Sequence, residues 1–226
     1  VLLEEHFDAL KEAGLDAVNI SIDTLDGELY RKITRCGDSG TVLKSLYRVI
    51  GDGSIPVKIN CVLVEYEERN ILDMAGLAEK YPVCVRFIEM MPIGCGRGFE
   101  YVPGDRILEL LEKKYGIASP VSEKQGSGPC RYFSFKGFAG KAGFINPMSH
   151  AFCTECSRIR LTSKGLLKTC LNYKEEADLM SLMRRGVTDT ELAEVIKNAV
   201  KKKPAGHSFC CGSDTEDRKI MSQIGG

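Results

Sequence analysis

The chain has 226 residues, of which 43% are hydrophobic and 27% are charged, a composition typical of globular proteins with a hydrophobic core. Lysine and arginine together number 31, as do aspartate and glutamate, so the composition excludes a whole-protein charge attraction to nucleic acid or to an anionic membrane. No apolar run approaches the roughly 18 residues of a membrane span. Any phosphate-binding surface must therefore be a local patch.

The first half of the chain alternates helical and strand patterns. The apolar spacing predicts helices at about residues 2–13 and 69–80, helical patterns from the end of the first strand to about Ile50, and strands at about residues 17–23, 56–63 and 83–89. Such alternation is typical of parallel βα units with right-handed crossovers.

Each of these three strands also carries polar side chains, although strands of a parallel sheet are usually apolar on both faces. A closed or half-closed barrel with its helices outside would place these side chains in one polar lumen, the usual location of a ligand site. The residues concerned are Asn19, Ser21 and Asp23 in the first strand, Lys58 and Asn60 in the second, and Arg86 in the third.

The second half begins with a predicted helix near residues 105–115 and a Ser-, Gly- and Pro-rich connector at residues 119–129. Short antiparallel strands are predicted at residues 130–135 and 143–145. Further helices are expected at about residues 175–185 and 189–201, the second with a capping box of Thr188 and Glu191.

Ten cysteines without a regular framework indicate a reducing compartment in which thiols bind metals. We therefore expect a cytoplasmic protein, or a mitochondrial matrix protein if the source is eukaryotic. The scattered single cysteines fit plain core or surface positions better than ligand positions. These are Cys36, Cys61, Cys84, Cys95 and Cys130.

The most specific pattern is the cysteine set C-x2-C-x13-C, formed by Cys153, Cys156 and Cys170. Two thiolates two residues apart can hold one metal centre from a single turn, and a third can return from a hairpin. Three protein ligands leave one coordination position open. A structural zinc site remains an alternative, with His150 or the Cys210–Cys211 pair as its fourth ligand.

Two arginines follow the first cysteine pair. Arg158 and Arg160 are two residues apart, so on a strand they would share one face, with Ile159 and Leu161 on the other. Two guanidinium groups beside an open metal site suit a phosphate-bearing ligand. An ordinary solvated, salt-bridged strand face is the competing interpretation.

Taken together, these motifs resemble the GTP 3′,8-cyclases, also called molybdenum cofactor biosynthesis protein A. These are the radical S-adenosylmethionine (SAM) enzymes that open molybdenum cofactor biosynthesis. The resemblance covers essentially the whole chain. It is carried by Asn19–Asp23, the strand with Lys58, Arg86–Met91, the run Phe152–Thr162, Cys170, and the closing Met221–Gly226.

The resemblance implies an α/β fold in which a partial (βα) radical-SAM, TIM-like barrel at residues 1–102 precedes a small α+β cluster domain at residues 103–226. That second part would be the molybdenum cofactor synthesis C-terminal domain. It would hold a second 4Fe-4S cluster whose open iron binds GTP.

The same resemblance assigns the site residues. Cys153, Cys156 and Cys170 would be metal ligands, and no catalytic residue is assigned. The GTP-binding residues would be Lys58, Arg158, Ile159 and Arg160. Ser21 and Met91 would contact SAM, and Gly225 and Gly226 would form a tail near the active site.

The implied reaction converts GTP to (8S)-3′,8-cyclo-7,8-dihydroguanosine 5′-triphosphate, with SAM as the radical source. The SAM-cleaving cluster of this family needs C-x3-C-x2-C, and no three cysteines of this sequence have that spacing. We expect that motif, with its own 4Fe-4S cluster, on a part preceding Val1, and we expect the present chain to be inactive alone.

The expected partners are a reductant for the clusters, the downstream cyclic pyranopterin phosphate synthase and a second copy in a homodimer, with neither nucleic acid nor membrane. Two alternatives remain open. One is another radical SAM enzyme with an auxiliary cluster, and the other is a non-catalytic zinc- or phosphate-binding module.

Overall fold

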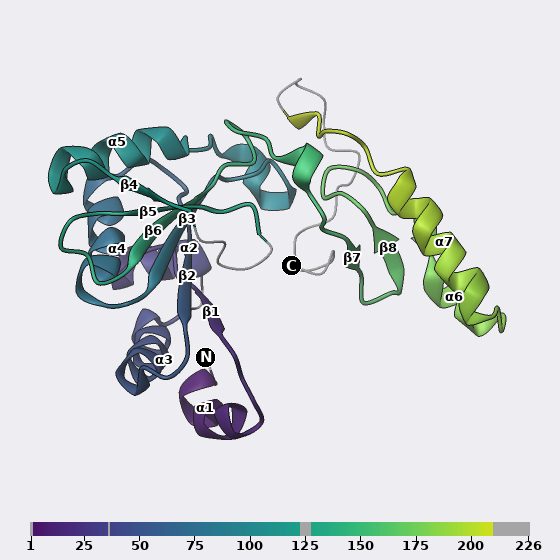
Figure 1. Cartoon of the computed structure of the whole chain (residues 1–226), viewed down its shortest axis with the longest axis horizontal. Helices are drawn as coiled ribbons and strands as arrows, with labels where there is room; N and C mark the ends of the chain where they lie inside the picture. The colour runs from purple at the N-terminus through teal and green to yellow at the C-terminus, as the bar shows by residue number, and fades with distance from the viewer. Residues whose placement is uncertain (1, 36, 123–127, 210–226) are drawn as a thin grey trace. The chain divides into compact units, whose positions relative to one another are not determined.

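The computed structural model describes residues 2–35, 37–122 and 128–209 (Figure 1). The chain forms two compact units. The first comprises Val1–Met90 with Tyr101–Ser149, and the second comprises Met91–Glu100 with His150–Gly226. The domain boundary expected between residues 102 and 103 stays a prediction. None of the helices in the described ranges has the length and apolarity needed to cross a membrane.

The first unit is built on a six-stranded sheet with the strand order β1-β2-β3-β6-β5-β4. Its strands are Val18–Ser21 (β1), Val57–Val62 (β2), Cys84–Ile88 (β3), Ser119–Val121 (β4), Arg131–Ser134 (β5) and Lys141–Ile145 (β6). Strands β1, β2, β3 and β6 run parallel to one another. Strand β5 pairs antiparallel with β6 on one side and with β4 on the other. The predicted parallel units and the predicted antiparallel pair are therefore confirmed within an α/β fold. The partial barrel stays a prediction.

One detail of the sheet differs from the expectation. The start of the stretch expected to be a connector forms the edge strand β4, with Pro120 opposite Phe133. A proline has no backbone N–H to donate, so it is tolerated on an edge strand, where one side of the backbone needs no partner. The local sequence resembles a loop, and only the pairing with β5 makes it a strand.

The helices of the first unit are Leu3–Glu12 (α1), Gly27–Thr34 (α2), Ser39–Asp52 (α3), Glu68–Lys80 (α4) and Gly104–Tyr115 (α5). Aspartates begin two of them. The side chain of Asp26 accepts from the N–H groups of Glu28 and Leu29, and Asp38 caps α3 in the same way. The helical patterns expected up to about Ile50 are thus the two helices α2 and α3, the second of which starts after Asp38.

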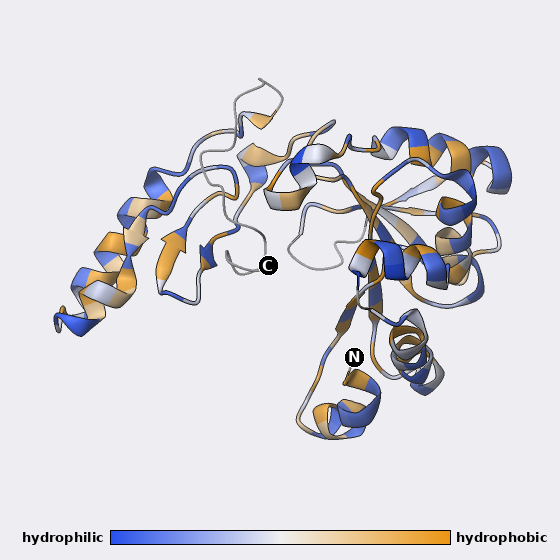
Figure 2. Ribbon diagram, turned by 180° about the vertical axis from the view of Figure 1, so that it is seen from behind, coloured by the Kyte–Doolittle hydropathy of each residue, from blue (hydrophilic) through white to orange (hydrophobic). Residues whose placement is uncertain are grey.

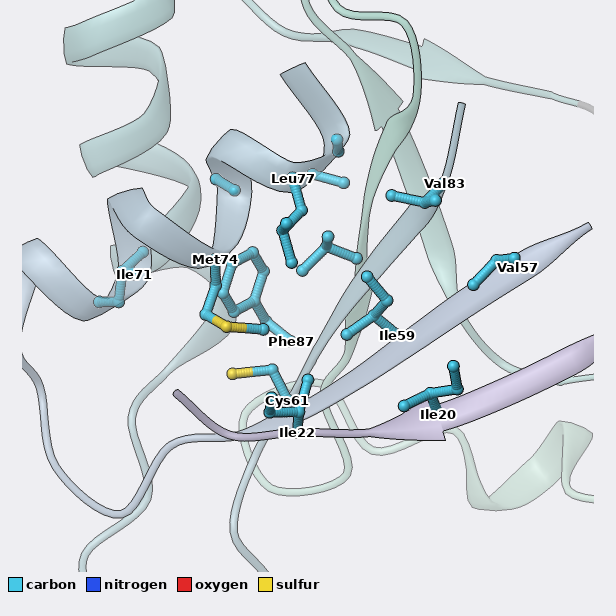
Figure 3. Close-up of a cluster of buried hydrophobic side chains, with 14 of the residues drawn as sticks. Ile20, Ile22, Val57, Ile59, Cys61, Ile71, Met74, Leu77, Val83 and Phe87 are labelled. Atoms are coloured by element: carbon cyan, nitrogen blue, oxygen red, sulfur yellow. The ribbon is translucent and has the colours of Figure 1, made fainter. Parts of the chain in front are cut away.

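The core of this unit lies between one face of the sheet and the helices α1, α3, α4 and α5. Alternate residues of the strands point into it, among them Ile59 of β2 and Phe87 of β3 (Figure 3). Met74 and Leu77 of α4 meet them from the other side (Figure 3). The intervening strand residues are half-buried or exposed, so the predicted polar face is confirmed.

The second unit contains a three-stranded antiparallel sheet in the order β7-β8-β9. The strands are Arg160–Leu161 (β7), Leu166–Lys168 (β8) and Ala177–Asp178 (β9), and the helices are Leu179–Arg184 (α6) and Asp189–Lys201 (α7). Two 3-10 helices, Gly94–Gly98 (η1) and Cys153–Glu155 (η2), complete it. The helix expected at residues 175–185 begins only at Leu179, because Ala177 and Asp178 pair with β8.

A small core joins the sheet of the second unit to its helices. Leu167 of β8, Leu179 of α6 and Ala199 of α7 are buried there. Both α6 and α7 carry hydrophobic and hydrophilic residues side by side, as expected of helices with one buried face (Figure 2). The predicted capping box of Thr188 and Glu191 is present at the start of α7.

Asp23, which follows β1, supplies a first test of this fold. Its Oδ1 accepts from the N–H of Val62 at 2.8 Å. Burial raises the pKa of the Asp23 carboxyl above its ordinary value, and the hydrogen bond from Val62 offsets part of that rise. The folded state therefore holds this proton to higher pH than the unfolded state does. The contribution of this proton to the free energy of unfolding is fully present below the pKa that Asp23 has in the unfolded chain. It is lost as the pH rises through the higher pKa of Asp23 in the folded chain.

We predict that Asp23→Asn raises the free energy of unfolding at pH 7, because the amide oxygen keeps the bond to Val62 without a buried charge. The gain should vanish at pH 3, where the wild-type carboxyl is protonated. Asp23→Ala, the control, should lose about 1–3 kcal/mol because the Val62 N–H is left without an acceptor. Urea unfolding at both pH values measures this, and a less stable Asp23→Asn protein at pH 7 would contradict it.

Gly165 shapes the turn between β7 and β8. Its φ of +72° lies in the left-handed region, and its N–H donates to the carbonyl of Thr162 at 2.9 Å. A Cβ added at this glycine would lie 2.6 Å from the Cβ of Met180. Both the backbone conformation and the space therefore require glycine here.

We expect Gly165→Ala to destabilise the chain by about 2–4 kcal/mol, combining left-handed strain with the clash at Met180. Gly186 is a matched control, since its φ is +75° but nothing lies within 4 Å of an added Cβ. Gly186→Ala should therefore cost only about 1–2 kcal/mol. Urea midpoints of the two variants provide the comparison, and equal losses would show that the contact with Met180 is unimportant.

Candidate functional site

The first two predicted metal ligands lie on one short turn. Cys153 opens η2, and the N–H of Cys156 donates to the carbonyl of Cys153 at 3.2 Å. Side chains three residues apart on a 3-10 turn lie nearly above one another. The turn therefore places both thiols on the same side, as chelation of one metal centre from a C-x2-C pair requires.

The third predicted ligand is positioned by the hairpin of β7 and β8. Arg160 pairs with Lys168 and Leu161 pairs with Leu167, and Cys170 follows two residues after the end of β8. The expected return through a hairpin is thus present. Cys153, Cys156 and Cys170 are all free thiols of intermediate burial, and all belong to the second unit.

The donor types fit an iron–sulfur cluster, because thiolates are its ordinary ligands. Within the described ranges, no three His, Cys, Asp or Glu side chains are gathered closely enough to hold a metal ion. Metal binding and local folding are coupled, since ligand segments are commonly drawn together by the metal they bind. The match of these residues to an iron–sulfur cluster therefore rests on three reduced thiols, two on one turn and the third just after a hairpin.

The two arginines lie between the cysteine turn and Cys170, at the entry to the hairpin. Arg160 belongs to β7, but Arg158 precedes the strand, so the expectation that both lie on one strand is wrong. Pairing with β8 begins only at Arg160. Burial, together with the nearby positive charge of Arg158, lowers the pKa of Arg160 from its ordinary value. Two cations this close together favour an anion beside them. Ile159 between them is exposed.

Lys203 is a site residue that the sequence analysis missed. Its ammonium donates to the carbonyl oxygens of Cys156 at 2.5 Å and of Arg158 at 2.9 Å, and lies 3.3 Å from the Cys156 Sγ. In the sequence, Lys203 ends a run of three lysines that begins with the last residue of α7, a pattern typical of a solvated helix end. No local signal distinguishes it from its neighbours.

The polar face of the first unit contains Lys58 and Ser21. Ser21 is the exposed last residue of β1, and Lys58 is a half-buried residue of β2. Lys58 also lines a cavity of about 210 Å³ with Cys84 and Lys141. Ligand pockets usually measure about 300–1,000 Å³, so this cavity is too small to hold a nucleotide.

Arg86 lies on the same face. Its Nη2 donates to the Asn19 Oδ1 at 2.7 Å, across the intervening strand β2. Its buried Nε, like the Oδ1 of Asn60, has no hydrogen-bond partner among the described residues. Burial raises the pKa of Cys130 to about 11 and that of Tyr132 to about 12, so these two neighbours stay neutral at pH 7. The positive charge of Arg86 is therefore not balanced by them.

The remaining predicted residues are less informative. Met91 is half-buried and follows β3 after two residues, in the second unit. Gly225 and Gly226 lie outside the described residues, as do Cys36, Cys210 and Cys211. A larger cavity, of about 800 Å³, lies among helices of the first unit, and no predicted site residue lines it.

Comparison with known proteins identifies the family. The family described as Molybdenum Cofactor Synthesis C matches residues 83–209. The GTP 3′,8-cyclase of Clostridium perfringens (strain 13) is 41% identical over 227 residues, covering 100% of this chain and 70% of the relative. The GTP 3′,8-cyclase of Moorella thermoacetica is 41% identical over 221 residues, covering 96% of this chain and 68% of the relative. The chain therefore belongs to the GTP 3′,8-cyclase family, which comprises radical SAM enzymes of molybdenum cofactor biosynthesis.

Proposed function

We propose that this chain serves the conversion of GTP to (8S)-3′,8-cyclo-7,8-dihydroguanosine 5′-triphosphate, with SAM as the radical source, in the first step of molybdopterin biosynthesis. The similarity to GTP 3′,8-cyclases along the whole chain supports the reaction. The observation that carries the proposal is the placement of Arg158 directly before the hairpin, and of Arg160 in its first strand, between the C-x2-C turn and Cys170.

Cys153, Cys156 and Cys170 would hold the second, substrate-binding 4Fe-4S cluster. When bound, a cluster with three protein thiolates offers one open iron, to which the purine of GTP can coordinate. The cluster that cleaves SAM needs another three cysteines, spaced C-x3-C-x2-C, which this sequence does not contain. In this proposal the chain binds and orients the substrate.

The cationic side chains would neutralise the triphosphate of GTP. Arg158 and Arg160 offer planar donor pairs suited to phosphate oxygens, and Lys58 adds a point charge from the sheet of the first unit. Exposed Ile159 would contact GTP from the same segment. Ser21 and Met91 would contact SAM, and the tail with Gly225 and Gly226 would reach toward the active site.

The wider setting follows from the same proposal. Residues 1–102 would form part of the radical-SAM barrel, and residues 103–226 would form the cluster domain. A reductant would supply electrons, and a cyclic pyranopterin phosphate synthase would consume the product. A homodimer and a cytoplasmic location complete the proposal, the location being supported by the free thiols of the seven cysteines in the described ranges.

Metal content provides the first test. Anaerobic reconstitution should load about four iron ions per chain, as expected of one 4Fe-4S cluster. Serine variants of Cys153, Cys156 and Cys170 should each lose most of this iron, whereas Cys95→Ser, at an exposed position of the same unit, should keep it. Iron and zinc analysis decides the matter. Stoichiometric zinc without iron uptake would favour the zinc-binding alternative.

GTP titration of the reconstituted chain tests the arginines. Arg158→Ala and Arg160→Ala should each weaken binding by about 1.5–3 kcal/mol, roughly ten- to a hundredfold in Kd, through loss of a charge-assisted hydrogen bond. Arg184→Ala removes an exposed arginine of α6 in the same unit and should have no effect. Unchanged affinity in both test variants would remove these arginines from the site.

A further inference from the structure

A short segment after α7 contacts both cysteine-bearing parts of the second unit. We call Lys203–Ser208 the strap. At its start, Lys203 donates to the carbonyls of Cys156 and Arg158. Farther along, the Gly206 carbonyl accepts from the Tyr173 hydroxyl at 3.1 Å, and the Ser208 Oγ accepts from the Asn172 Nδ2 at 2.9 Å. The strap thus connects the segment after the C-x2-C turn to the segment after Cys170.

The strap is itself fixed to the hairpin. The N–H of Lys203 donates to the carbonyl of Val200 at 3.1 Å, so the strap leaves directly from the last turn of α7. That helix packs through buried Ala199 against the small core that includes Leu167 of β8. Lys203 is therefore held by the same core that sets the hairpin.

The two carbonyls that Lys203 contacts belong to residues two apart. In an extended segment, carbonyls two residues apart point the same way, and so do the corresponding side chains. Cys156 has the extended backbone angles φ −77° and ψ 106°. By binding both carbonyls, Lys203 fixes the segment in this form and places the side chains of Cys156 and Arg158 on one side.

The third contact of the ammonium is with sulfur. An ammonium has three N–H donors, and here two are directed at carbonyl oxygens while the Cys156 Sγ lies 3.3 Å away. Hydrogen bonds to the sulfur atoms are one of the features that set the reduction potential of an iron–sulfur cluster. A cation donating to a ligand sulfur stabilises the added electron and so raises that potential.

We propose that Lys203 is a positioning residue, which holds Cys156 for the cluster and Arg158 for GTP phosphate together, and which donates to the ligand sulfur. This inference rests on the proposed function of the three cysteines. It adds to that function a cation that binds neither substrate nor product. Its contribution passes through the backbone of the Cys156–Arg158 segment and through one thiolate.

The experiment compares three variants of the reconstituted chain: Lys203→Met, Lys203→Arg, and Lys202→Met as an exposed neighbour one residue away. Three quantities are measured: iron per chain, the midpoint potential of the cluster by titration followed with electron paramagnetic resonance, and the Kd for GTP. Lys203→Met should shift the potential to more negative values and weaken GTP binding about tenfold. Lys203→Arg should retain most of both properties, and Lys202→Met should match wild type.

Wild-type potential and wild-type GTP affinity in Lys203→Met would overturn the proposal. If Lys203→Met does not take up iron, the Lys203→Arg variant decides. Iron uptake by that variant, with a cluster midpoint potential near that of the wild type, supports the role of a donating cation. A folded arginine variant, judged by circular dichroism, that takes up no iron contradicts it. An absence of iron uptake by the wild-type chain would instead overturn the proposed function itself, and this inference with it.

Discussion

The pairing of β7 with β8 is the constraint on which the candidate site depends. Only two residue pairs define it, yet it sets how the chain travels from Cys156 back to Cys170. A slip by one residue would turn every side chain of the hairpin to the opposite face. Leu167 resists such a slip because it is buried in the small core, and the buried Lys168 adds a hydrogen bond from its ammonium to the Tyr173 carbonyl.

The sheet of the first unit shows a second constraint, because its two faces differ in polarity. One face is apolar and covered by helices, as hydrophobic burial demands. The other keeps Lys58, Asn60 and Arg86 on adjacent strands, and the buried Asn60 Oδ1 and Arg86 Nε lack hydrogen-bond partners among the described residues. Such groups cost free energy unless something satisfies them, which favours a ligand at this face.

Most elements could be predicted from the sequence, because their periodicity is local. Alternation of apolar residues located β1 to β3, and the capping box located α7. Prediction failed where distant pairing decides the structure: β4 is a strand only because of β5, and residues 177–178 are a strand only because of β8. The candidate site residues come from motif spacing and resemblance, and their roles stay predictions. The contact of Lys203 with Cys156 spans 47 positions in the sequence, and no local pattern encodes it.

The turn that holds Cys153 and Cys156 has a consequence for handling the protein in air. A 3-10 turn rises about 2 Å per residue, so these two residues lie roughly 6 Å apart along it, within the Cα separation that a disulfide allows. Oxidation of the pair by two electrons would form one S–S bond and remove two of the three proposed ligands at once. A dithiol reductant would restore both thiols by exchange. The geometry that suits the pair to chelation thus makes oxygen a direct competitor of iron.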